Sequence, residues 1–175
     1  MTDETAVDLD PTTFITVGAE GPPGERTFYL QAAQSQRVVS LIIEKEQAIA
    51  LAASIDRLAV GVLRRDPSRA AALEAPAGNL DLLLPLQPLF RVAEMGIGVD
   101  EERGVFVLVA QDEPEEEGPG RRARFVATFA QMVALARQAL HVAQQGRPTC
   151  PLCGRPMEPD GHFCPRANGH DHLRD

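Results

Sequence analysis

The residues best suited to chemistry are the three cysteines of the chain, which all lie near its C-terminus. Cys150, Cys153, Cys164 and His170 are spaced as Cys-x2-Cys-x10-Cys-x5-His. Zinc prefers thiolate and imidazole ligands in a tetrahedral array, and four such ligands leave no open position for a substrate. The spacing therefore predicts a structural Zn²⁺ site, with these four residues as the metal ligands.

The residues around the cysteines favour tight turns. Gly154 directly follows the Cys-x-x-Cys pair and can adopt a positive φ, which lets backbone amides point at sulfur. A redox Cys-x-x-Cys pair usually opens a helix in a βαβ unit, and Pro151 and Gly154 disfavour a helix here. A redox pair, a cluster of free thiols and a catalytic zinc with an open position are the alternatives to a structural site.

The fourth ligand is a choice among three histidines. His170 follows Asn168-Gly169, a pair that permits a tight bend. His162 and His172 are the alternatives. His162 lies only two residues before Cys164, so we expect it to reach the same ion poorly.

An internal repeat organises the chain before this tail. Residues 25–34 and 102–111 both begin with Glu-Arg and end with Ala-Gln, and residues 47–52 align with 131–136. The offset grows from 77 to 84, which an acidic insertion at about 112–120 accounts for.

Each copy is predicted to run strand, strand, strand, helix. The expected strands span residues 14–17, 27–33 and 37–43 in the first copy, and about 89–97, 105–111 and 122–127 in the second. Apolar residues with helical spacing follow in both copies, and Thr128 with Gln131 forms a capping box at the second helix.

This pattern predicts an α+β fold made of duplicated βββα units, with an antiparallel sheet and two main helices. The duplicated domain would span residues 10–145, with copies at about 12–65 and 88–145. A small zinc-binding tail, like a zinc knuckle or ribbon, would span residues 146–175.

Composition narrows the function classes. The formal net charge of −8 disfavours nucleic-acid binding, because an acidic surface repels phosphate backbones. No basic, apolar leader opens the chain and no apolar run is long enough to span a membrane, so we expect a cytoplasmic protein without a membrane partner.

The chain also has features that resemble a known family. The run Gly-Glu-Arg-Thr-Phe-Tyr-Leu-Gln-Ala at 24–32 and the cysteine-rich motif at 150–170 resemble domain of unknown function 3090, found mainly in actinobacteria and some Chloroflexi. The tail motif matches through Cys150, Cys153, Cys164 and His170. The family has no established activity, so the resemblance assigns no catalytic residue to this chain.

Three functions are compatible with these observations. We expect a cytoplasmic binding or adaptor protein that contacts a protein partner, because no catalytic motif is present; this favours a non-enzyme without deciding it. The second is an enzyme or small-molecule binder with a pocket between the two halves, around Arg26, Tyr29 and Gln31. The third is nucleic-acid binding through the zinc tail.

Overall fold

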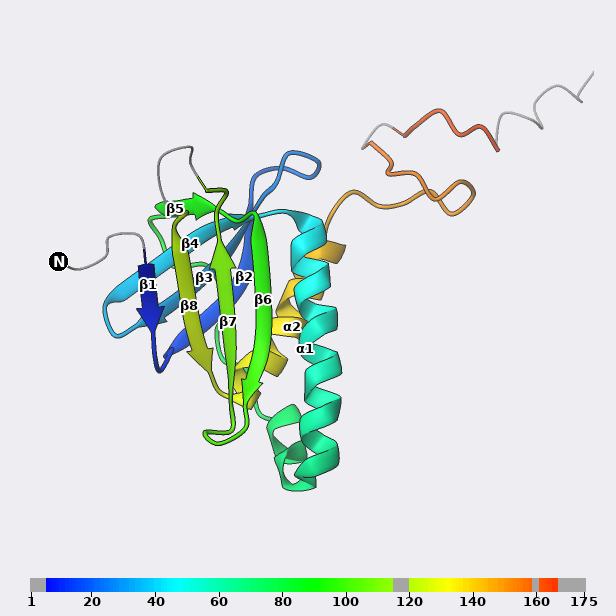
Figure 1. Cartoon of the computed structure of the whole chain (residues 1–175). Helices are drawn as coiled ribbons and strands as arrows, with labels where there is room; N and C mark the ends of the chain where they lie inside the picture. Colours follow the sequence, from blue (N-terminus) through cyan, green and yellow to red (C-terminus); the bar gives the residue numbers. More distant parts are fainter. Residues whose placement is uncertain (1–5, 115–119, 159–160, 167–175) are drawn as a thin grey trace, which may run out of the picture.

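The fold is α+β with two long helices, as the sequence predicts, and its strands form two four-stranded sheets (Figure 1). It was obtained as a computed structural model, which describes residues 6–114, 120–158 and 161–166. No helix in these parts of the chain is long and apolar enough to cross a bilayer.

The first half of the chain contains four strands, a long helix and a short 3-10 helix. They are β1 (Ala6–Leu9), β2 (Phe14–Glu20), β3 (Thr27–Gln34), β4 (Arg37–Ile43), α1 (Lys45–Arg65) and η1 (Pro67–Leu73). The second half repeats the order of strands and helix. Its elements are β5 (Pro88–Arg91), β6 (Glu94–Asp100), β7 (Val105–Gln111), β8 (Arg122–Ala127) and α2 (Phe129–Gln144).

The two halves exchange elements. β2, β3 and β4 form one antiparallel meander, and β6, β7 and β8 form another. The strand that precedes each meander pairs in parallel with the last strand of the other, so β1 lies beside β8 and β5 beside β4. Each sheet is therefore mixed, which corrects the expectation of an antiparallel sheet. The element order matches the predicted βββα units, whereas the duplication itself stays a prediction.

The helices are exchanged in the same way. α1 follows the first meander but contacts β6, and α2 follows the second meander but contacts β2. β6 and β2 are each the edge strand of a sheet. The two helices also pack against one another, so the pair lies along one side of the stacked sheets (Figure 1).

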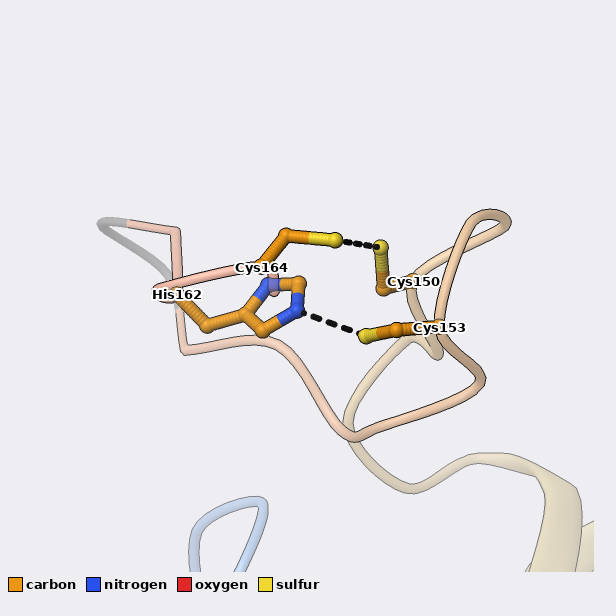
Figure 2. Close-up of side chains that lie close together, drawn as sticks. All are labelled: Cys150, Cys153, His162 and Cys164. Carbon is orange, nitrogen blue, oxygen red and sulfur yellow. Dashed lines mark hydrogen bonds between the residues drawn. The ribbon is translucent and has the colours of Figure 1, made fainter. Parts of the chain in front are cut away.

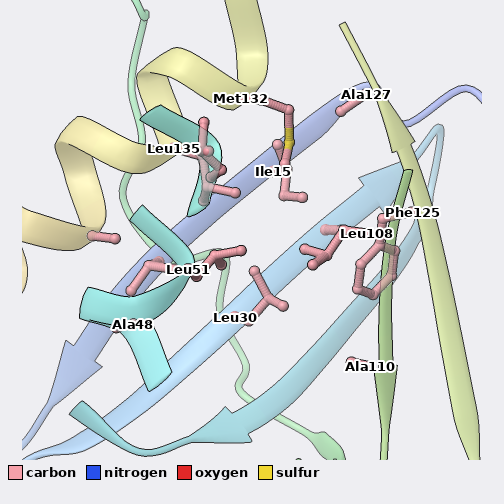
Figure 3. Packing of buried hydrophobic residues seen from close by; sticks show 14 of the residues in the cluster. Ile15, Leu30, Ala48, Leu51, Leu108, Ala110, Phe125, Ala127, Met132 and Leu135 are labelled. Carbon is pink, nitrogen blue, oxygen red and sulfur yellow. The ribbon is translucent and has the colours of Figure 1, made fainter. Parts of the chain in front are cut away.

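A single hydrophobic core, mostly aliphatic but with phenylalanines such as Phe106 and Phe125, joins both sheets and both helices (Figure 3). Leu30 of β3 and Leu108 of β7 are fully buried, as are Ile55 of α1 and Leu135 of α2. Burying side chains of this size contributes about 1.5–3 kcal/mol each. The core therefore holds the two halves together as one folding unit and fixes the end of α2, from which the tail leaves.

Both long helices begin with a capping box. The backbone N–H of Glu44 donates to Gln47 Oε1, and that of Thr128 donates to Gln131 Oε1, each at 2.8 Å. Thr128 Oγ1 accepts from the Gln131 N–H at 3.2 Å. This confirms the cap predicted for α2.

One strand prediction was wrong, and one strand was missed. The stretch 89–97 is not one strand: it divides into β5 and β6, which belong to different sheets. Val92 and Ala93 separate them, and their backbone N–H groups donate to Ile42 of the first sheet and Gln111 of the second. β1 was not predicted at all.

Candidate metal centre

A short hairpin presents the first two cysteines. Thr149 and Pro156 form an antiparallel bridge. Within the hairpin, the Cys150 N–H donates to the Arg155 carbonyl and the Gly154 N–H to the Cys150 carbonyl, both at 2.8 Å. Gly154 has φ +71°, the conformation that its position in the motif predicts. The turn therefore brings the sulfur atoms of Cys150 and Cys153 to the same side of the chain.

A second arm brings the remaining ligands back to this hairpin. Glu158 and Gly161 form another antiparallel bridge, and Gly161 has φ +94°. His162 and Cys164 follow. Nη1 of Arg166 then donates to the Leu152 carbonyl at 3.0 Å, which ties the arm to the Cys-x-x-Cys turn.

Four potential ligand atoms converge between the two arms (Figure 2). The Sγ atoms of Cys150, Cys153 and Cys164 and one ring nitrogen of His162 all lie within 4.8 Å of one another. The Sγ atoms of Cys150 and Cys164 are 3.8 Å apart, and Cys153 Sγ is 3.1 Å from His162 Nε2. This Cys3His group could hold a metal ion.

The spacing of the sulfur atoms fits zinc better than a disulfide. Zn–S bonds of about 2.3 Å at the tetrahedral angle place two sulfurs about 3.8 Å apart, which is the distance between Cys150 and Cys164. A disulfide requires about 2.0 Å, and all three cysteines are free. Cys150 and Cys164 are buried, so the site is shielded from water on one side.

The electrostatics of the hairpin favour a thiolate at its first cysteine. Hydrogen bonds from the backbone N–H groups of Cys153 and Leu152 lower the pKa of the Cys150 thiol. The Arg155 N–H lowers the pKa of the Cys153 thiol, but burial and the adjacent sulfurs outweigh it, so this pKa is raised. Three sulfurs so close together cannot all ionise without a cation between them, which is what a divalent metal supplies.

The structure brings together three of the four predicted ligands. Cys150, Cys153 and Cys164 meet, whereas His170 and the alternative His172 lie outside the described residues. The imidazole found with the sulfurs is that of His162. Its reach was expected to be poor, but the bend at Gly161 turns the ring toward Cys153. Gly161 before His162 is a sequence signal for this bend, but Gly169 before His170 gives the same signal, so it does not distinguish the two histidines.

The comparison with family models extends over this site. Residues 7–164 match the family described as "Protein of unknown function (DUF3090)". The chain belongs to this family. The matched region begins in β1 and ends at Cys164, so it includes the two sheets and the four converging ligands. No curated protein and no solved structure matches the chain.

The second predicted site does not form as one pocket. Gln31 is fully buried, where its side chain donates to Ser40 Oγ and to the Leu83 carbonyl, both at 2.9 Å. It also accepts from the Leu83 N–H at 2.7 Å. Gln31 therefore fastens the segment between the two halves onto the first sheet. Arg26 lines two pockets, and neither of them is lined by Tyr29 or Gln31.

Proposed function

We propose that the protein is a binding or adaptor module whose C-terminal tail folds around a structural zinc ion. The observation that supports this most strongly is the convergence of three sulfurs and one imidazole nitrogen within 4.8 Å. Three thiolates and one imidazole are a ligand set typical of structural zinc. The proposed ligands are Cys150, Cys153, Cys164 and His162, with His162 in place of His170.

The composition of the tail supports a structural role for the metal. The proposed domains are a body at residues 10–145 and a tail at 146–175. The large apolar side chains of the tail do not form a core, because Leu152 is 53% and Phe163 75% exposed. An ion held by four ligands supplies the missing core, a contribution of about 10–16 kcal/mol in small zinc peptides.

The closed ligand set favours binding over catalysis. A catalytic zinc keeps a position open for water or substrate, and here four protein ligands fill the tetrahedron. We further propose a cytoplasmic location, because a Cys3His site requires reduced thiols. The net charge of −8 favours a protein partner over nucleic acid.

Chelation combined with limited proteolysis tests this function. We expect the purified protein to contain one zinc ion per chain. Removing it should make the chain cleavable after about residue 146, while the body keeps its helical circular dichroism and its thermal transition. A Cys150→Ser/Cys164→Ser variant should resemble the chelated protein without chelator. A tail that resists protease equally well with and without zinc would contradict the proposal.

A further inference from the structure

A pocket of about 490 Å³ lies where the tail leaves the body. Its walls come from the β2–β3 loop and the start of β3, the start of α1, the end of β5 and the first residues of the tail. Four cationic side chains line it: Arg26, Lys45, Arg91 and Arg147. The volume is within the range of small-molecule sites, about 300–1,000 Å³.

The charge of this pocket is opposite to that of the whole molecule. Its lining contains only two carboxylates, Glu44 and Glu46, against the four cations, which leaves a formal charge of +2. The chain as a whole carries −8. Arg91 is paired with Glu44, and Arg147 with Glu158. In the described part of the chain Arg26 and Lys45 have no ion-pair partner, so the pocket keeps uncompensated positive charge.

Two of the arginines that line the pocket have unused hydrogen-bond donors. Within the described residues, Arg26 Nη1 and Arg147 Nε are buried and have no acceptor. A buried donor without an acceptor costs about 1–3 kcal/mol, or more for a charged group. Oxygen atoms of a bound anion would supply the acceptors that these guanidinium groups lack.

Local packing fixes the positions of both groups. The Arg26 guanidinium lies over the Phe28 ring, with Cζ 5.3 Å from the ring centroid. Arg147 lies against Gly24, which has φ +91°, and a Cβ at this position would be only 2.0 Å from Arg147 Nη2. Gly24 therefore makes room for Arg147 at the mouth of the pocket.

Another cavity, at the far end of α1, has no uncompensated positive charge among its described residues. Its cations Arg65 and Arg69 are paired with Glu101 and Asp66, and Arg69 also donates to the Gly104 carbonyl at 2.8 Å. The two cations and the two carboxylates of this cavity balance, so its described lining has no net charge to attract an anion.

We propose that the pocket beside the tail binds a phosphorylated small molecule. A phosphate monoester carries a charge of about −1.5 to −2 at neutral pH, more than the −1 of one carboxylate, and the unpaired cations Arg26 and Lys45 of the lining would attract it. A planar arginine guanidinium can donate two hydrogen bonds to the oxygens of one phosphate. The dipole of α1 also favours an anion at the N-terminus of this helix. This inference rests on the proposed function, because Arg147, Thr149 and Pro156 belong to the zinc-ordered tail.

Titration calorimetry of the zinc-loaded full-length protein tests the proposal, with inorganic phosphate, pyrophosphate and malonate as probes at matched ionic strength. We expect pyrophosphate to bind at one site per chain, phosphate to bind more weakly and malonate more weakly still. Arg26→Gln and Arg147→Gln should each weaken pyrophosphate binding roughly 10- to 100-fold, the loss of a charged hydrogen bond. Arg57→Gln is the matched control and should bind like the wild type.

Gly24→Ala provides a variant that removes no charge. Its Cβ should displace Arg147 and weaken pyrophosphate binding while the zinc content stays at one per chain. No binding of pyrophosphate, equal binding of malonate, or unchanged affinity in both arginine variants would overturn the proposal. Zinc content is measured on the same samples: zinc without anion binding refutes this inference alone, and anion binding without zinc refutes the proposed function alone.

Discussion

In the tail, a few residues determine where the backbone turns. Gly154 and Gly161 both have positive φ, and each is followed by a segment that returns to the metal centre. The three cysteines could be identified from the sequence because their spacing is typical of zinc ligands. The histidine could not, because three candidates lie within ten residues of Cys164 and their spacing alone does not distinguish them.

Replacing single histidines tests the assignment of the fourth ligand. We expect His162→Ala to lower zinc affinity by about 100-fold or more, because a three-thiolate site loses its fourth bond. His170→Ala should keep near wild-type affinity, and His141→Ala, on α2, serves as the control. Competition with a chromogenic chelator gives the three affinities. A large loss in His170→Ala with none in His162→Ala would restore the ligand set predicted from the sequence.

The acid stability of the body should depend on Asp10. Hydrogen bonds from Arg103 at 2.7 Å lower the pKa of this carboxyl below its usual 3.8, and Arg124 adds to the effect. A carboxyl whose pKa is lower in the folded state stabilises the protein at pH values above its pKa in the unfolded state. This contribution is lost as the pH falls through the pKa of the folded state. Between pH 7 and pH 3, the free energy of unfolding measured with urea should therefore fall less for Asp10→Asn than for the wild type. Equal losses would contradict this role.

At the scale of elements, local signals were sufficient for the hairpins and the helices. β4, β7 and β8 span the predicted residues, and the capping residues mark where both helices begin. β1 was missed because four residues are too few for a clear alternating pattern. Its partner β8 lies more than a hundred residues away, so nothing near β1 in the sequence indicates the pairing.

The cap of α2 can be tested by two substitutions. Thr128→Ala removes the side-chain oxygen that accepts from the Gln131 N–H, and we expect the free energy of unfolding to fall by about 1 kcal/mol. Thr128→Ser keeps that oxygen and should remain close to wild type. Chemical denaturation of the three proteins gives the comparison. Equal destabilisation by both substitutions would show that the methyl group, rather than the cap, is what matters.

At the scale of the whole molecule, the exchange between halves is the feature that sequence patterns could not supply. Periodicity predicts which face of α1 is buried, but not that this face contacts β6 rather than its own meander. The stretch 89–97 shows the same limit, since its two parts are both β-prone yet pair with different sheets. Pairings between distant segments are decided by the packing of the complete core.

The core and the tail are stabilised by different means. The body buries a large hydrophobic cluster, whereas the tail has two buried cysteines and exposed apolar side chains. Zinc in the tail would also hold Arg147 at the pocket beside α1. The central claim is therefore that three sulfurs and one imidazole share one zinc ion.

X-ray absorption spectroscopy at the zinc edge of the purified protein tests this claim most directly. The expected spectrum shows one zinc per chain with three sulfur neighbours at about 2.3 Å and one nitrogen neighbour at about 2.0 Å. A shell of nitrogen and oxygen atoms alone, or a protein that retains no zinc while its thiols are reduced, would contradict it.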